Sequence, residues 1–506
     1  MNKEYPTLEQ FCKAAEKVQI IALSTKISWD HESVMSLAGR FIDEEYFFLL
    51  ESAAAGSGPI PRYSFLGFSP LWSWELKGGV ESISRQLKGE SKKKLPLGAN
   101  PIEEMHHAFS ELKLKHLEGQ AYQGPDLAAL GGVVGFCGYE LAAMLEPKIG
   151  APLEKRLDLP DMLYYLPENY LIFDQLTRSL YVFRFVSVEG QGAQELKLTY
   201  DSACKKLDQL QESLLEPTQL ERVKFEHSSI DFSSFSSTVA EGPFLEKVKI
   251  CLAEISKGEI FQIQIGNRLS KQVEAHPFSI FRHLRMLNPS PYMFYYKFQS
   301  HIILGSSPEM MVNLEGSILT HRPIAGTRKR TWKKDTDQLM KKELLQSEKE
   351  RAEHIMLVDL GRNDLGRISR PGSVHVQDLM TVEEYSHVFH MVSEITGELE
   401  LTFNAATALS ASFPNGTVTG APKVRAMELI NQLEPCAREF YAGSLGLFSF
   451  NGDLKSTILI RSIHICDGLA STQASAGIVY DSIPAHEWME TRHKMSACLY
   501  AMQNTK

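Results

Sequence analysis

Apolar runs separated by short polar turns indicate strands along most of the chain. Residues 170–188 (YLIFDQLTRSLYVFRFVSV) contain two such runs, and the polar residues 175–179 between them predict a hairpin. Asp467-Gly468 joins two further strand patterns, and this dipeptide is typical of a two-residue hairpin turn. Because consecutive strands with short turns pair antiparallel, we expect mainly antiparallel sheet.

Helical periodicity lies between these strand patterns. It covers residues 335–365, 400–412, 420–432 and 484–503. We expect these helices to pack on the faces of the sheet. Since strands and helices do not alternate as regular βαβ units, the pattern predicts the fold class α+β.

A change in composition divides the chain. Residues 205–225 are charged and helix-like, whereas residues 226–240 (EHSSIDFSSFSSTVA) are rich in serine. A helix followed by a polar segment is typical of a linker. We therefore predict an N-terminal region at 1–225, a Ser-rich linker at 226–240 and a C-terminal region at 241–506.

Composition and charge exclude several classes of protein. Hydrophobic residues make up 43% of the 506 residues, which is typical of a globular protein. The net charge of −9 gives no basic excess for nucleic acid. The longest apolar run, Leu127–Tyr139, is shorter than the roughly 20 residues of a membrane span. With no hydrophobic stretch of signal-peptide type at the N-terminus, we expect a cytoplasmic protein that binds neither nucleic acid nor membrane.

The cysteines do not indicate a reactive site. All seven are scattered and none forms a CxxC pair, so neither a disulfide framework nor a thiolate zinc site is predicted. Cys137 lies in the glycine-rich segment Gly131–Gly138, which lacks the spacing of a phosphate loop. A nucleophile elbow would need a glycine where Tyr139 stands, so we interpret this segment as close backbone packing in the core.

Two of the predicted helices begin with paired glutamates. Glu350 and Glu353 stand three residues apart, as do Glu487 and Glu490, so each pair shares one helix face. Acidic residues also suit a helix N-terminus without any further function. If the two helices converge, however, their carboxylates form an oxygen-only cage of the kind that Mg²⁺ prefers.

Other residues offer contacts to an anion. Arg461 stands in the otherwise apolar run Thr457–Cys466, which we expect to be one strand. A guanidinium inside a sheet needs an acidic partner or an anionic ligand. Gly477, which we expect across the hairpin from Ile458, is typical of a strand position where a ligand or backbone approaches closely.

Two loops could also hold carboxylates, through backbone N–H groups and hydroxyls. They are Arg322–Thr327, which follows a strand pattern, and Asn415–Lys423, which leads into a helix N-terminus. His390 stands in an apolar run, where a histidine is usually a core residue. It gains functional weight only if the glutamate pairs and Arg461 surround it.

These motifs together resemble one enzyme family. PIAGT, ERAEHIMLVDLGRNDLGR, HMVSEITG, GTVTGAPK, the run with Arg461, ASAGIV and the final ExxE helix occur in this order in chorismate-utilising enzymes. Within that family the chain resembles the large subunit of anthranilate synthase over nearly its whole length. The match is highly specific at 245–502 and looser before 225, where LLES and RYSF carry it.

The resemblance implies a fold of two large antiparallel β-sheets wrapped by helices. It implies Mg²⁺ held by Glu353 and Glu490, with Glu350 and Glu487 in support. It also implies two sets of residues around chorismate. The catalytic set is His390, Glu309, Gln262 and Thr417, and the substrate-binding set is Gly326, Thr327, Tyr441, Arg461, Ser475, Ala476, Gly477 and Lys494.

The activity implied by the resemblance is the first step of tryptophan biosynthesis. Chorismate and ammonia give anthranilate and pyruvate. The ammonia comes from glutamine through a glutamine amidotransferase subunit, in a heterotetramer of two large and two small subunits. Tryptophan acts as a feedback inhibitor at a separate site, formed by Glu51, Ser52, Pro291, Tyr292 and Met293.

Two positions bear on the alternatives. Isochorismate and salicylate synthases carry a water-activating lysine where this chain has Gln262. Aminodeoxychorismate synthases commonly carry a nucleophilic lysine where this chain has Ala325. Both residues favour anthranilate synthase, although an aminodeoxychorismate or aminodeoxyisochorismate synthase remains an alternative. The other alternative is a catalytically silent regulatory homologue, and the complete set of site residues argues against it.

Overall fold

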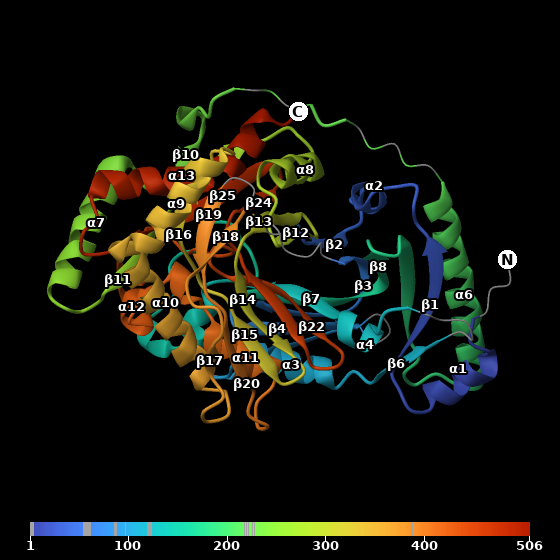
Figure 1. Ribbon diagram of the computed structural model, residues 1–506. Helices are drawn as coiled ribbons and strands as arrows, with labels where there is room; N and C mark the ends of the chain where they lie inside the picture. The colour runs from blue at the N-terminus through green and yellow to red at the C-terminus, as the bar shows by residue number, and fades with distance from the viewer. Residues whose placement is uncertain are drawn as a thin grey trace.

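A computed structural model describes residues 5–53, 62–85, 89–96, 98–118, 124–216, 218, 220, 222–224, 226, 228–385 and 388–506. Within these residues no helix is both long and apolar enough to span a membrane. Strands make up the centre of the molecule, and helices cover its ends and edges (Figure 1). The fold is therefore α+β, as the sequence predicted.

Most strands join one large, strongly curled sheet whose pairings are antiparallel except between β1 and β6. Its strands are β1 Ile20–Ser28, β2 Tyr46–Glu51, β3 Tyr63–Lys77, β4 Val80–Arg85, β5 Gly89–Lys94, β6 Leu114–Leu117, β7 Gly132–Cys137, β8 Met162–Asp174, β9 Ser179–Ser187, β10 Ser236–Ser237, β11 Gln262–Gln272, β12 Tyr292–Phe298, β13 His301–Ser307, β14 Met310–Glu315, β15 Ile318–His321, β17 His375–Val376, β20 Ile395–Glu398, β21 Gly420–Ala421, β22 Ser444–Ser449, β23 Leu454–Ile458, β24 Ser462–Cys466 and β25 Leu469–Ile478.

The sheet folds over on itself, and aromatic side chains fill the space between its two layers. The Tyr296 ring on β12 lies 6.0 Å from Phe136 on β7 and 5.6 Å from Tyr165 on β8. All three side chains are fully buried. Burial of such large apolar surfaces is the main favourable contribution to folding, so this layer interface forms the principal core.

Segments from both halves of the sequence share this sheet. Strand β2 pairs with β12, so that Leu50 lies opposite Phe294. Strand β7 pairs with β22, with Gly135 opposite Gly446. The division of the chain at 226–240 into two regions stays a prediction about folding units, while the strands on either side of it interleave.

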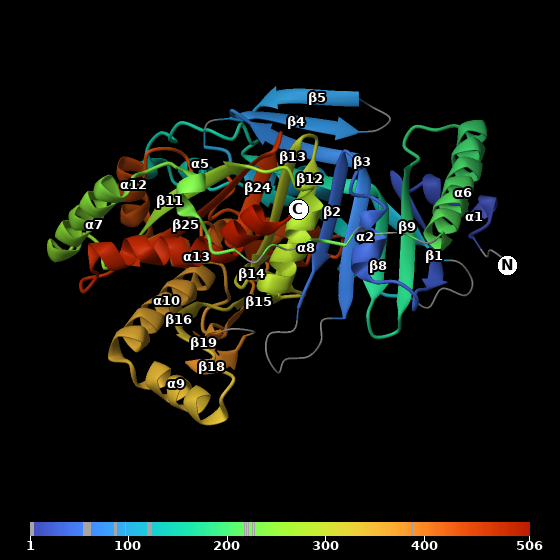
Figure 2. The ribbon, with the colours of Figure 1, turned by 90° about the horizontal axis from the view of Figure 1, so that it is seen from above.

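Helices pack around the outside of the sheet, mainly at the two ends of the molecule (Figures 1 and 2). They are α1 Leu8–Ala15, α2 Val34–Gly39, α3 Pro101–Ser110, α4 Leu127–Leu130, α5 Leu141–Leu145, α6 Ala193–Leu215, α7 Glu241–Ser256, α8 Pro277–Leu287, α9 Lys334–Gln346, α10 Glu348–Gly366, α11 Ala405–Ser412, α12 Lys423–Leu433 and α13 Pro484–Asn504.

A smaller three-stranded sheet stands at one edge of the molecule beside α9 and α10, as Figure 2 shows. It consists of β16 Ile324–Lys329, β18 Thr381–Glu384 and β19 Val388–Val392. Leu344 of α9 packs with Phe389 and Met391 of β19 in a separate small core. This sheet carries the PIAGT segment and His390 next to the start of α10.

The structure confirms the expected hairpins and corrects three details. Strands β8 and β9 form the first hairpin, and β24 and β25 form the second, with Gly468 at φ +77° in its turn. The expected helix 335–365 is two helices, because Ser347 ends α9 and caps α10 through its hydroxyl. The run 457–466 is not one strand, since it breaks at Arg461. Gly477 lies opposite Gln264 of β11 rather than opposite Ile458.

Candidate active site

The two glutamate pairs converge at the N-terminal turns of α10 and α13. The Glu353 side chain is half-buried. Its partial removal from water raises its pKa, and so does repulsion from Glu350 and Glu490. The pKa of Glu487 is raised by burial and by Glu490. Carboxylates influence one another in this way only at short range. The helices therefore place their acidic faces together, which the sequence alone could not establish.

Cations already neutralise two of these carboxylates. Lys494 Nζ lies 2.6 Å from Glu490 Oε1, and Arg328 Nη1 lies 3.0 Å from Glu350 Oε1. Across the described residues, no three His, Cys, Asp or Glu side chains form a ready-made metal site. The donors nevertheless suit Mg²⁺ chemically, since all are oxygens and Glu487 Oε2 is a buried oxygen with no hydrogen-bond partner.

Gln262 connects β11 to the carboxylates. Its Nε2 donates a 3.0 Å hydrogen bond to Glu353 Oε1, while its own Oε1 is buried without a partner. Gly477 on the neighbouring strand gives this side chain room. A Cβ added to Gly477 would lie only 3.0 Å from Gln262 Nε2 and 2.9 Å from Gln264 Nε2. The close approach expected of this glycine is real, and the approaching groups are two glutamine amides.

Arg461 occupies the break between β23 and β24 with φ +52°, a conformation that a residue with a side chain rarely adopts. Its Nη1 donates to the carbonyl of Lys494, and burial lowers the pKa of its guanidinium. In the described part of the chain, no carboxylate forms an ion pair with it. A half-buried cation without a carboxylate partner is suited to an anionic ligand.

Lys494 lies between this guanidinium and the carboxylates. Its Nζ donates to Ser475 O at 3.0 Å as well as pairing with Glu490. The Ser475 hydroxyl in turn lies 2.7 Å from the Tyr441 hydroxyl, which accepts a 2.9 Å hydrogen bond from Ser475 N. The end of β25, from Ser475 to Gly477, is therefore fixed beside the two cations.

Glu309 supplies an acid near Lys494. It follows β13, its side chain is only 5% exposed, and burial raises its pKa to about 8 despite a hydrogen bond with Thr417 and the nearby Lys494. The carboxyl is therefore protonated at neutral pH. Its Oε1 is buried without a partner, so a proton held there can be given to a bound molecule.

His390 faces the PIAGT segment across the β16–β19 pairing. Its Nδ1 lies 3.0 Å from Gly326 O and 3.2 Å from the Thr327 hydroxyl. Because a carbonyl only accepts, Nδ1 carries the proton and Nε2 is left with a free lone pair. Burial lowers the pKa of His390 to about 4, with a further contribution from Arg461, so the ring is neutral.

Gly326 must be glycine for two reasons. Its φ is +64°, and a Cβ there would lie 2.7 Å from Leu344 Cδ1 and 3.0 Å from Glu350 Oε2. The backbone of the PIAGT segment consequently passes directly beside the first glutamate pair. Sequence reasoning missed Arg328, which follows the segment immediately and neutralises Glu350.

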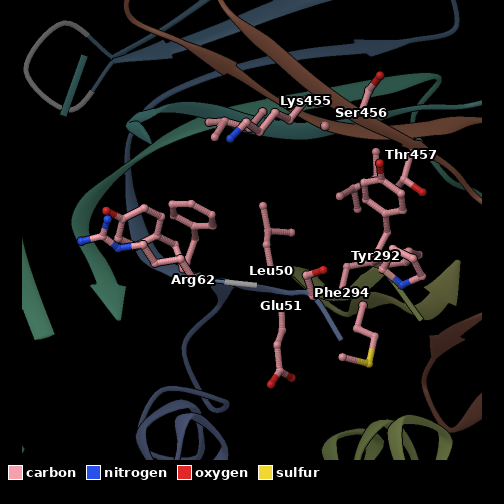
Figure 3. A pocket seen from close by; sticks show the side chains of 16 residues that line it. Leu50, Glu51, Arg62, Tyr292, Phe294, Lys455, Ser456 and Thr457 are labelled. Carbon is pink, nitrogen blue, oxygen red and sulfur yellow. The ribbon is translucent and has the colours of Figure 1, made fainter. Parts of the chain in front are cut away.

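The predicted inhibitor residues lie around a cavity of about 280 Å³ that the carboxylates and cations of this site do not line (Figure 3). Glu51, Ser52, Pro291, Tyr292 and Met293 all border it. Sequence reasoning missed the opposite wall, which comes from β22 and β23. Its lining residues are Leu445, Gly446, Leu447, Lys455, Ser456 and Thr457.

Glu51 is already paired within the protein. Its two carboxylate oxygens each lie 2.6 Å from the guanidinium of Arg285 on α8. Figure 3 shows its carboxylate directed away from the side of the cavity where Leu50 stands, because successive residues of a strand point to opposite faces. In this conformation Ser52 and backbone groups are the polar contacts that the β2 side offers.

The chain is similar to known proteins over most of its length. Residues 68–500 match the family model described as chorismate binding enzyme. Anthranilate synthase component 1 of Acetivibrio thermocellus is 37% identical over 503 residues, covering 99% of this chain and 98% of that protein. Aminodeoxychorismate synthase component 1 of Bacillus subtilis is 37% identical over 455 residues, covering 90% and 91%.

A solved structure gives the same result. Anthranilate synthase component I from Streptococcus pneumoniae matches with a TM-score of 0.73 and 33% identity, over 87% of this chain and 92% of that one. The curled antiparallel sheet and a site built from cations, an acid and clustered carboxylates define a class of enzymes that act on chorismate. The chain belongs to the family of chorismate binding enzymes.

Proposed function

We propose that this chain is the chorismate-converting subunit of an anthranilate synthase. The observation that carries the proposal is the hydrogen bond from Gln262 to Glu353, at the position where water-using relatives carry a lysine base. An amide bound to a carboxylate cannot activate water, so ammonia is the nucleophile that suits this site. Ala325, which is buried, likewise offers no side chain for covalent attack.

The cations bind the substrate. Chorismate is a dianion, and Arg461 and Lys494 present two positive charges beside the end of β25. Thr327, Tyr441 and the 475–477 backbone complete the contacts to its carboxylates. This arrangement holds the ring between Glu309 on one wall and His390 on the other, with Thr417 beside Glu309.

Glu309 and His390 then move the protons. Glu309 donates its proton to the ring hydroxyl, which leaves as water while ammonia bonds to the ring and loses a proton. The proton that ammonia loses restores Glu309. His390 Nε2 next takes a proton from the ring as the bond between the ring carbon and the enolpyruvyl oxygen breaks, and the released enolpyruvate takes up a proton to become pyruvate. The ring becomes aromatic, so chorismate and ammonia yield anthranilate, pyruvate and water.

The glutamate cluster is the proposed Mg²⁺ site. Glu353 and Glu490 would be direct ligands, and Glu350 and Glu487 would support them. Bound Mg²⁺ would offset the negative charge of the cluster and hold a carboxylate of chorismate. The pKa values of Glu353 and Glu487 are both raised, first by burial and then by the charge of Glu490, and this supports the assignment because a bound cation relieves such repulsion.

The remaining parts of the proposal concern partners and control. The relatives' names, component 1, support a separate glutamine amidotransferase subunit that delivers ammonia in the cytoplasm, in a tetramer of two large and two small subunits. Tryptophan would occupy the 280 Å³ cavity, with indole against Leu50 and Phe294 and its polar end near Ser52. This cavity would make the enzyme subject to feedback inhibition.

A second candidate is an aminodeoxychorismate synthase subunit, because a relative of that name is as similar as the anthranilate synthases. Incubation with chorismate, Mg²⁺ and an ammonium salt separates the two. Anthranilate fluorescence is the expected result. A non-aromatic amino product that needs a further lyase would establish the second candidate, and recovery of unchanged chorismate would point to a silent homologue.

A further inference from the structure

The pairing of β14 with β23 is irregular next to Glu309. Met310 lies opposite Thr457 and Asn313 lies opposite Lys455, so β14 takes three residue steps where β23 takes two. An extra residue on one strand is a β-bulge, which bends the strand and redirects the side chains beside it. The bulge begins one residue after Glu309.

Two hydroxyls from β23 hold this bulge. Ser456 Oγ accepts a 3.2 Å hydrogen bond from Val312 N and donates to Val312 O. Thr457 Oγ1 donates a 2.7 Å hydrogen bond to Glu309 O, and Ile458 N donates to the same carbonyl at 3.1 Å. Side chains therefore replace the ladder hydrogen bonds that the bulge interrupts.

These two residues also form part of the wall of the 280 Å³ cavity. Figure 3 shows Thr457 and Tyr292 at the same end of that cavity. Ser456 and Thr457 are 2% and 3% exposed, so neither can shift without moving its neighbours. A single residue, Thr457, thus lines the cavity and holds the backbone of Glu309.

We propose that Thr457, assisted by Ser456, is a positioning residue for Glu309, and that filling the cavity is communicated to the acid through this bulge. The inference rests on the proposed lyase function, in which Glu309 is the acid. A molecule in the cavity contacts Thr457 directly, and a shift of Thr457 displaces the carbonyl that it holds. Coupling of this kind is reciprocal, so substrate at Glu309 also alters binding in the cavity.

The test uses Thr457→Val, which keeps the shape of threonine and removes its hydroxyl. In the full-length chain with ammonium, kcat should fall about tenfold, the effect of losing roughly one hydrogen bond's net contribution, while KM for chorismate changes less than about twofold. Thr457→Ser should restore kcat. Thr505→Val is the matched control, since its buried hydroxyl donates to Ala501 O at the end of α13, and its kcat should equal that of wild type.

A double-variant cycle separates positioning from a general structural effect. If Thr457 acts through Glu309, then Thr457→Val should cause no further loss of kcat in a Glu309→Gln background. Ser456→Ala should show the same dependence on Glu309 and serves if Thr457→Val unfolds. Full kcat in both single variants, or losses that multiply fully with Glu309→Gln, would overturn the proposal.

Communication from the cavity to Glu309 can be measured separately, through the binding of tryptophan and its inhibition of turnover. Calorimetry should give a tryptophan Kd for Thr457→Val within about threefold of wild type. At equal occupancy of the cavity, however, tryptophan should inhibit turnover of the variant less than turnover of wild type. Equal inhibition at equal occupancy would show that the bulge does not transmit binding. A wild-type chain that forms no anthranilate would instead contradict the proposed function, before any variant is compared.

Discussion

The amide of Gln262 and the carboxylate of Glu353 are joined by a 3.0 Å hydrogen bond that links β11 to the second turn of α10. Gly477 permits it, since any larger residue there would contact the Gln262 amide. This relationship couples a strand to the proposed metal-binding helix. Gln262 also stands at the position that would decide between ammonia and water as nucleophile.

Gly477→Ala should reduce turnover at least tenfold while leaving the protein folded. The added Cβ would lie 3.0 Å from the end of a flexible side chain, so Gln262 can move away from Glu353 at small cost in stability. Steady-state kinetics and thermal unfolding check this. Gly242→Ala is the control because a Cβ there contacts nothing. Unchanged kcat in Gly477→Ala would disprove the role of the glycine.

Glu490→Gln should abolish turnover with little effect on the unfolding temperature. The change removes a proposed Mg²⁺ ligand and leaves Lys494 without its carboxylate partner. A second readout is independent of activity, because Mg²⁺ should raise the unfolding temperature of wild type and not of the variant. Full activity in the variant, or in wild type with excess chelator, would exclude this site.

The pH dependence of kcat should carry the pKa of Glu309. The acid must be protonated to donate, and its pKa is about 8, so kcat should be constant below that pH and fall above it. Glu309→Gln should lose most activity. Conversely, if kcat fell only at a much higher pH, another group would supply the proton.

Glu309 also predicts how stability depends on pH. Its folded pKa is raised above the unfolded value of 4.5, so the folded state binds more protons and stability falls as pH rises from about 4.5 to about 8. Glu309→Gln removes this penalty. Its unfolding temperature relative to wild type should therefore be higher at pH 8 than at pH 5. A difference independent of pH would contradict the buried, protonated acid.

Ammonium should support the isolated chain, whereas glutamine should not. Cys137, the one cysteine in a glycine-rich segment, is fully buried and burial raises its thiol pKa to about 12, so it cannot serve as a glutaminase nucleophile. At fixed total ammonium that does not saturate the enzyme, the rate should rise with pH up to about 8, because more free NH₃ forms while Glu309 stays protonated. Anthranilate made from glutamine by the chain alone would refute the need for a partner subunit.

Ser52→Phe should relieve inhibition by tryptophan and leave chorismate turnover nearly intact. The new ring would block the β2 side of the 280 Å³ cavity, which Ser52 borders, so tryptophan could not enter and press on Thr457 at the opposite wall. Ser91→Phe, on the exposed strand β5, is the matched control and should keep normal inhibition. If wild type ignores millimolar tryptophan, or if Ser52→Phe loses turnover and inhibition together, the cavity is not a separate inhibitor site.

Local patterns in the sequence determined the elements and the residue types of the site. Helix periodicity, the Asp467-Gly468 turn and the i, i+3 glutamate pairs are short-range properties, so α10, α13 and the β24–β25 hairpin were predictable. Motif order was sufficient to indicate the family, because each motif carries its residues wherever the fold places them.

Only the tertiary structure decided which groups meet. The break at Arg461, the pairing of Gly477 with Gln264 and the ion pair of Glu51 with Arg285 all depend on segments distant in sequence. Strand periodicity is the same whichever neighbour a strand chooses, so register and bulges are invisible in one sequence. For the same reason the chain gave no sign that Thr457, 148 residues from Glu309, holds that residue's carbonyl.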